Sequence, residues 1–215
     1  MKKYSLSFIG LLLLSFLIIP FKATAIENNS DDDMTNITKA CDFIFNERRL
    51  WVDHTLWSRS FIISDVDSLG DKDAVLQRLL KNQDDIGNSI KPYYGEEAGN
   101  KLAALLREHI ELAGKVIEAA KSNNKTDLDK YNKLWHTNAD EIAKFLASIN
   151  PNLSESELKD MLYIHLGYLT KQTTYRLNKD WDKEIADFDK NEDHMIHFAD
   201  IISKGTIKEF PEKFK

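Results

Sequence analysis

Apolar residues recur every three or four positions along most of this chain, and this spacing constrains its fold more than any other feature. Positions 43, 50, 57 and 61 carry Phe, Leu, Trp and Phe, which fall on one face of a helix. Such a helix gains stability by packing that face against other helices. Pro and Gly number only 4 and 8 of the 215 residues, and no segment alternates strictly between polar and apolar residues. The sequence therefore predicts an all-α fold.

Polar breaks and capping residues divide the chain into separate helices. Ser154 to Glu157 has the form of a capping box, Asn150-Pro151 ends the helix before it, and Gly205 is expected to end the last helix. We predict long helices over about residues 43–67, 96–121, 126–149, 155–177 and 181–204. The expected architecture is an up-and-down bundle of four to five long helices, forming a single domain over residues 41–210.

Residues 68–95 are less regular than the rest of this domain. The segment ends in Pro92-Tyr93-Tyr94-Gly95, and only residues 74–81 have the pattern of a short helix. It also separates two similar helix pairs, because Leu-Trp-x-x-His at residues 50–54 resembles Leu-Trp-x-x-Asn at residues 134–138. We interpret residues 68–95 as a short helical insertion that packs on one end or side of the bundle.

The first 25 residues have the three parts of a secretory signal peptide. Lys2 and Lys3 form a charged start, residues 8–19 are apolar, and Ala23-Thr24-Ala25 supplies the small residues of a cleavage site. The apolar run is short for a membrane span. We expect cleavage near Ala25, then a flexible acidic linker over residues 26–40, and a secreted or extracytoplasmic cell-surface protein without stable membrane insertion. An uncleaved N-terminal anchor is the alternative.

The net charge argues against two kinds of partner. It is −6 for the whole chain, and loss of the three lysines Lys2, Lys3 and Lys22 with the signal peptide makes it −9. An acidic protein repels nucleic acid and anionic membrane surfaces, so we expect neither as a partner. Cys41 is the only cysteine, so the chain forms no internal disulfide. A protein partner or a small ligand is left open.

Each long predicted helix carries a polar residue within its apolar face. These residues are His54, His109, Asn138, His165 and Glu192, and they lie at similar heights when counted from the predicted turns. Imidazoles with a carboxylate are a typical transition-metal ligand set, and helical bundles build such sites from inward side chains of facing helices. We therefore predict that His54, His109, His165 and Glu192 bind one ion of Zn, Cu, Fe or Mn.

Other polar residues have secondary places in this hypothesis. Asn138 and Glu47 are expected as weak ligands or as partners that orient the imidazoles. Four further residues lie off the main apolar faces and are interpreted as solvated surface, with surface metal binding as the alternative: His136, Asp140, His194 and His197. The core histidines are equally compatible with a hydrogen-bonded network that holds no metal.

Four segments resemble a known group of sequences: LWVDHTLWSR (residues 50–59), KPYYGEEAGNKLAALLREHI (91–110), NADEIAKFLASINP (138–151) and MLYIHL (161–166). They resemble an uncharacterised family of small exported helical-bundle proteins of spore-forming Gram-positive bacteria. Some members carry the labels glycosyltransferase or acetylglutamate kinase, and the lack of a βαβ pattern in this chain supports neither label. The resemblance implies export and a helical bundle, and it adds no mechanism.

The sequence thus supports two functional hypotheses from different classes. The first is an exported bundle with a histidine-rich transition-metal site in its core. The alternative is a metal-free interaction module, at the cell surface or extracellular, with a buried polar network. No phosphate-binding glycine loop, GxSxG motif or doubled Glu-x-x-His motif is present, so no reaction is assigned.

Overall fold

The computed structural model describes the backbone of residues 30–215 and the side chains of residues 38–215. The predicted signal peptide lies outside the described residues, so export and cleavage stay predictions. The elements are α1 (Ser30–Val66), α2 (Lys72–Lys121), α3 (Lys125–Ile149), α4 (Glu155–Leu177), α5 (Trp181–Glu209) and the short 3-10 helix η1 (Pro211–Phe214). Residues 30–215 contain no strand, which confirms the all-α prediction.

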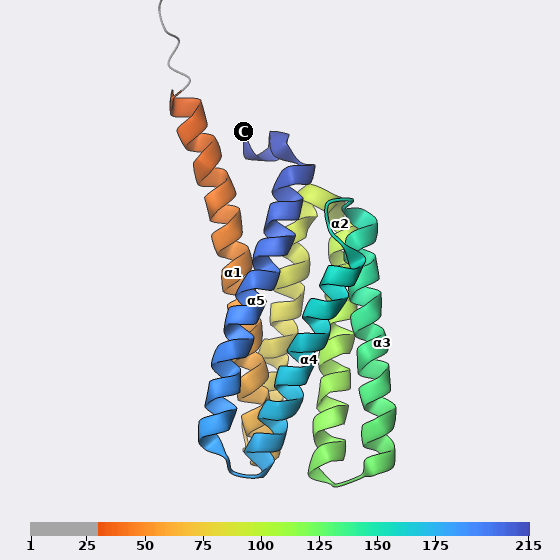
Figure 1. Cartoon of the computed structure of the whole chain (residues 1–215). Helices are drawn as coiled ribbons and strands as arrows, with labels where there is room; N and C mark the ends of the chain where they lie inside the picture. Colours follow the sequence, from red (N-terminus) through yellow and green to blue (C-terminus); the bar gives the residue numbers. More distant parts are fainter. Residues whose placement is uncertain (1–29) are drawn as a thin grey trace, which may run out of the picture.

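The helices form an up-and-down bundle, as predicted (Figure 1). Each helix packs against the next one along the chain, and α5 closes the bundle by lying against α1. The connections between helices are short, so that neighbours in sequence become antiparallel neighbours in space.

Helix α2 folds back on itself at Gly95 and supplies two antiparallel rods of the bundle (Figure 1). Gly95 has φ 86° and ψ 169°, a conformation that is open essentially to glycine alone. On the two sides of this reversal Gly87 and Gly99 touch: a Cβ on Gly87 would lie 2.5 Å from the Gly99 carbonyl oxygen. The hairpin thus depends on three glycines, one for the turn and two for the close approach of its arms.

Residues 68–95 are therefore not an excursion on one end or side of the bundle. Leu79, Ile86 and Ile90 of this segment are 1%, 1% and 2% exposed, so its helix belongs to the core. Two polar residues, Asn82 and Gln83, follow the short helix predicted over residues 74–81, and both are completely buried. Each donates a hydrogen bond to a backbone carbonyl, Asn82 to Leu50 and Gln83 to Leu79, which makes their burial possible.

Several helix ends differ from those predicted. Helix α1 begins at Ser30, within the segment expected as a linker, and α3 begins at Lys125, capped by Asn124, one residue before the predicted start. Ser154 caps α4 as predicted, accepting a hydrogen bond from the Glu157 amide. Helix α5 continues past Gly205, which is buried inside it. A Cβ on Gly205 would lie 2.6 Å from Leu153 Cδ2, so this glycine serves close packing and not helix termination.

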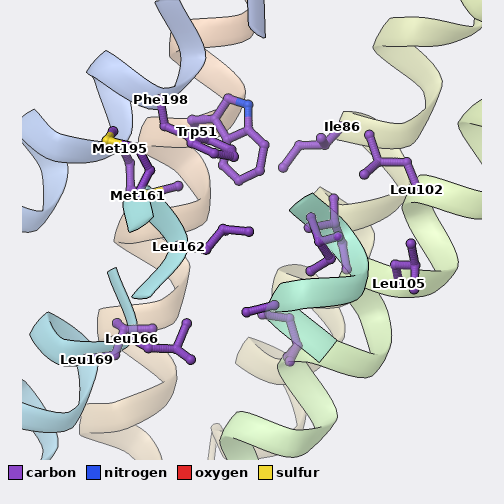
Figure 2. Close-up of a cluster of buried hydrophobic side chains, with 14 of the residues drawn as sticks. Trp51, Ile86, Leu102, Leu105, Met161, Leu162, Leu166, Leu169, Met195 and Phe198 are labelled. Carbon is purple, nitrogen blue, oxygen red and sulfur yellow. The ribbon is translucent and has the colours of Figure 1, made fainter. Parts of the chain in front are cut away.

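The part of the hydrophobic core around Trp51 consists of aromatic and aliphatic side chains. Figure 2 shows Trp51 beside Phe198, Met195 and Met161, with Ile86, Leu102 and Leu105 of α2 on the other side of the cluster. The Trp51 and Phe198 rings meet edge to face, 4.9 Å between centroids. These contacts between helices form the hydrophobic core of the bundle.

Over the described residues no helix has the length and apolar character needed to cross a membrane.

Candidate functional site

Six buried side chains form a polar layer at mid-height in the bundle, which we call the histidine layer: His54, Gln83, His109, Asn138, His165 and Asn191. Each is between 0% and 2% exposed. Buried polar groups need hydrogen-bond partners, and three amide side chains beside three imidazoles can provide them. The buried histidine network is thus a feature of this fold.

His54 and His165 face each other across the bundle. Their Nε2 atoms are 3.3 Å apart and their ring centroids 5.3 Å apart. On its other side, the Nδ1 atom of His165 lies 2.7 Å from Asn191 Oδ1. Because a carbonyl oxygen only accepts, His165 Nδ1 carries the proton and its Nε2 presents a lone pair to His54. His54 Nδ1 and Gln83 Oε1 are both buried and have no hydrogen-bond partner.

His109 is oriented in the same way by a different helix. Its Nδ1 atom lies 2.7 Å from Asn138 Oδ1, and Asn138 Nδ2 donates to the Leu105 carbonyl at 3.1 Å. The second contact fixes the orientation of the amide, so His109 Nδ1 donates to Asn138 Oδ1. His109 Nε2 therefore presents a lone pair, and this buried atom has no hydrogen-bond partner.

The three imidazoles are neutral. Burial lowers the pKa of His54 to about 3, with a further lowering by His109. Burial also lowers the pKa of His109 to about 4, although the Asn138 hydrogen bond opposes it. For His165 burial and the neighbouring His54 lower the pKa well below its usual range. Neutral imidazoles are the form that binds metal ions and that accepts hydrogen bonds.

The structure places the predicted ligands in three different situations. His54 and His165 are in contact, His109 lies close enough to lower the pKa of both, and Glu192 is only half-buried on α5. Asn191, one residue earlier, occupies the core position on that helix. Among residues 38–215 no group of three or more His, Cys, Asp or Glu side chains is arranged to hold a metal ion.

The position of Glu192 reflects an error of one residue in the predicted core face of α5. Trp181 and Ile185, which share a face of α5 with Glu192, are 41% and 46% exposed. The residues that point inward in this half of α5 are instead polar: Glu184, Asp187 and Asn191. The buried positions Met195, Phe198 and Ile202, continued backward in steps of three and four, identify this face.

The remaining predicted residues do not converge. His136 and His194 each bond a backbone carbonyl, that of Asn132 and that of Met161 respectively, and His197 is exposed. Asp140 accepts a hydrogen bond from the Tyr163 hydroxyl and pairs with Lys159. Asn138 orients His109, the role expected for it.

Glu47 is buried elsewhere on α1, with 1% exposure and no hydrogen bond to either carboxylate oxygen. Burial raises its pKa from 4.5 to about 7. A raised carboxyl pKa stabilises the fold below pH 4.5, and this contribution is lost as the pH rises through 7. Above pH 7 the buried Glu47 carboxylate is therefore ionised, and its charge destabilises the folded protein.

We expect Glu47→Gln to stabilise the protein at pH 8 by about 2 kcal/mol, because the neutral amide removes the buried charge. At pH 5, where Glu47 is protonated in the fold, the substitution is expected to change little. The measurement is urea unfolding of both proteins at the two pH values. Glu141→Gln, at an exposed position in the middle of α3, is the control. An equal effect at pH 5 and pH 8 contradicts the assignment of the raised pKa.

Comparisons with known proteins identify no relative of this chain. No family model, curated protein or solved structure matches this chain. The class to which the geometry assigns the protein is an all-α up-and-down bundle with a buried histidine and amide layer. The candidate functional features are therefore that layer and the surfaces and cavities around it.

Proposed function

We propose that this protein is an exported metal-binding bundle in which His54 and His165 hold one transition-metal ion. The observation that carries the proposal is the 3.3 Å separation of their Nε2 atoms. Two metal–nitrogen bonds of about 2.0–2.1 Å at a tetrahedral angle place their nitrogens about 3.3–3.4 Å apart. The two imidazoles are thus spaced as a pair of ligands on one ion. The same contact also allows an N–H···N hydrogen bond between the two rings, which is the metal-free alternative.

The partners of these histidines support the same proposal. Metal-binding histidines commonly donate their second ring N–H to a carbonyl or carboxylate oxygen, which fixes the ring and its tautomer. Asn191 Oδ1 does this for His165. Gln83 is the matching group for His54, since its Oε1 atom has no other partner and its side chain raises the pKa of His54. An amide therefore holds the His165 ring from behind, and the unpaired Oε1 atom of Gln83 is the amide oxygen available to His54.

The small number of protein ligands limits the metal affinity of the site. Two protein nitrogens leave the other coordination positions to water or to a small molecule, so we expect an affinity below that of a closed structural zinc site. Imidazole suits Zn, Cu and Fe, and Mn completes the set to be tested. Export is part of this proposal and rests on the N-terminal sequence, since residues 1–25 lie outside the described part.

Metal content and thermal unfolding test the proposal. The protein is purified without chelator, its metal is measured, and its melting temperature is recorded with chelator and with each of Zn, Cu, Fe and Mn. A bound ion at a hundred times its dissociation constant is expected to stabilise the fold by about 2.7 kcal/mol. The proposal is overturned if the purified protein holds no metal and none of the four ions changes the melting temperature.

Variants assign the effect to the two ligands. His54→Gln and His165→Gln are each expected to abolish the difference between metal and chelator, because one remaining imidazole binds weakly. His109→Gln is expected to preserve most of it. His197→Gln, at an exposed position, is the matched control. Since every variant is compared with itself, a general loss of stability does not affect the result.

The metal-free interaction module is the second candidate. The observation in its favour is that hydrogen bonds already pair residues of the histidine layer without an ion. One set links α1, α4 and α5, and a second set links α2 and α3. On this reading the layer fixes the register of the helices, and binding takes place on the outer surface. The metal experiment decides between the two, because a structural layer gives no metal-dependent stabilisation.

A further inference from the structure

A second feature of the core lies below the histidine layer. A cavity of about 90 Å³ is lined by residues of α1, α2, α3 and α4. Its walls are mostly aliphatic and aromatic, and no Asp, Glu, Lys or Arg side chain lines it. A cavity of this size exceeds the roughly 10–15 Å³ needed for one water molecule. It therefore has room for a molecule of a few non-hydrogen atoms.

Three polar atoms of the cavity wall have no hydrogen-bond partner: Ser58 Oγ, His109 Nε2 and Trp135 Nε1. Their residues are 5%, 2% and 2% exposed. The hydroxyls of Thr170, Thr173 and Thr174, also in the wall, are already bonded to backbone carbonyls. An unpaired buried polar group costs about 1–3 kcal/mol, so three of them around one cavity point to a missing partner.

The chemistry of these atoms defines that partner. Trp135 Nε1 only donates a hydrogen bond, and His109 Nε2 only accepts, because the Asn138 contact keeps the proton on His109 Nδ1. The two rings are neighbours, with centroids 5.3 Å apart. A single hydroxyl group satisfies both, since it donates one hydrogen bond and accepts another. Ser58 can act as either partner.

We propose that this cavity binds a small uncharged alcohol. Its hydroxyl donates to His109 Nε2 and accepts from Trp135 Nε1, and its apolar chain fills the space between the aliphatic walls. A charged ligand is disfavoured because the wall offers no countercharge. Water alone fits poorly, since each water needs two to four polar partners and the wall provides them for about one molecule.

The proposal is independent of the metal site, because it uses His109 and not the pair of His54 and His165. The test uses the full mature chain after treatment with chelator. We would titrate 1-butanol and follow amide signals of α2 and α3 in two-dimensional ¹H–¹⁵N spectra. Butyrate and butylammonium, of similar size but charged, are the matched ligands. Saturable shifts at residues of the cavity wall are expected with 1-butanol only.

Two variants test the position and the chemistry of the site. Ala113→Leu puts a larger side chain into the cavity wall and is expected to weaken butanol binding at least about tenfold. Ala104→Leu, an exposed position on the same helix, is the control for that substitution. Trp135→Phe keeps an aromatic ring at this position but removes the N–H donor, and about a tenfold loss is expected.

Several results overturn the proposal. Shifts that do not saturate mean that only solvent enters the cavity. Equal binding of butyrate or butylammonium removes the argument from charge. Unchanged butanol affinity in both Ala113→Leu and Trp135→Phe places the binding elsewhere. If Ala113→Leu fails to fold by circular dichroism, Trp135→Phe still decides, because it removes the hydrogen-bond donor without adding volume to the cavity wall.

Discussion

Lowering the pH from 6.5 to 4.5 is expected to reduce the free energy of unfolding by about 4–5 kcal/mol. The cause is the histidine layer, in which the pKa values of His54, His109 and His165 are lowered from 6.5. Below pH 6.5 the unfolded chain takes up protons at these residues and the folded protein does not. Each histidine therefore contributes stability above pH 6.5 that is lost as the pH falls toward its folded pKa.

Glu47 acts in the opposite direction over the same range. Its pKa is about 7 in the folded protein and 4.5 in the unfolded chain. As the pH falls, Glu47 therefore takes up its proton in the folded protein first. Near pH 5 three histidines favour unfolding and one carboxyl group opposes it, a net difference of two protons. Two protons correspond to about 2.7 kcal/mol for each pH unit. This is large compared with a typical total stability of about 5–15 kcal/mol.

The measurement is urea unfolding at half-unit steps of pH, with chelator present so that metal release does not contribute. His109→Gln is expected to reduce the slope near pH 5 by about 1.4 kcal/mol per pH unit, since one proton no longer distinguishes the two states. His197→Gln, which replaces an exposed histidine, leaves the slope unchanged. A flat profile between pH 6.5 and 4.5 would show that the histidines are protonated in the fold.

The second large effect is expected at the ion pair that joins α1 to α5. Arg59 Nε and Nη2 donate to the two carboxylate oxygens of Glu184 at 2.7 and 2.9 Å. The Glu184 side chain is 1% exposed, so its charge depends on this contact. Arg59→Met leaves a buried carboxylate without a partner, which typically destabilises a protein by about 3–5 kcal/mol. We expect about 3 kcal/mol, because the arginine side chain is 26% exposed and water can reach its place.

A double variant separates the loss of the pair from the isolation of the charge. Arg59→Met with Glu184→Leu replaces both groups by apolar ones, and such replacements are often neutral or stabilising. We expect the double variant to recover most of the stability lost in Arg59→Met alone. Urea unfolding at pH 7 measures all three proteins. If the double variant is as unstable as Arg59→Met, the contact stabilises by packing, and the buried charge is not the cause.

The local pattern of the chain was sufficient to predict much of the site. His54, His109, Asn138 and His165 were found because each interrupts a clear apolar stripe, and all four are buried. Asn191 and Gln83 were missed for one physical reason: they lie where several consecutive inward positions are polar. A prediction of the inward face from hydrophobicity is wrong there, because hydrogen-bond partners on other helices allow polar side chains to be buried.

The sequence by itself determined the helical class, the antiparallel order of the helices and the polar residues within each clear stripe, since these follow from spacing along one helix. Only the tertiary structure decided the hairpin of α2, the inward face of α5 and the pairing within the histidine layer. Each of these depends on a contact between distant residues: Gly87 with Gly99, Arg59 with Glu184, His54 with His165. The spacing of residues along one helix determines which side chains share a face. The packing of the helices determines which of these side chains contact one another.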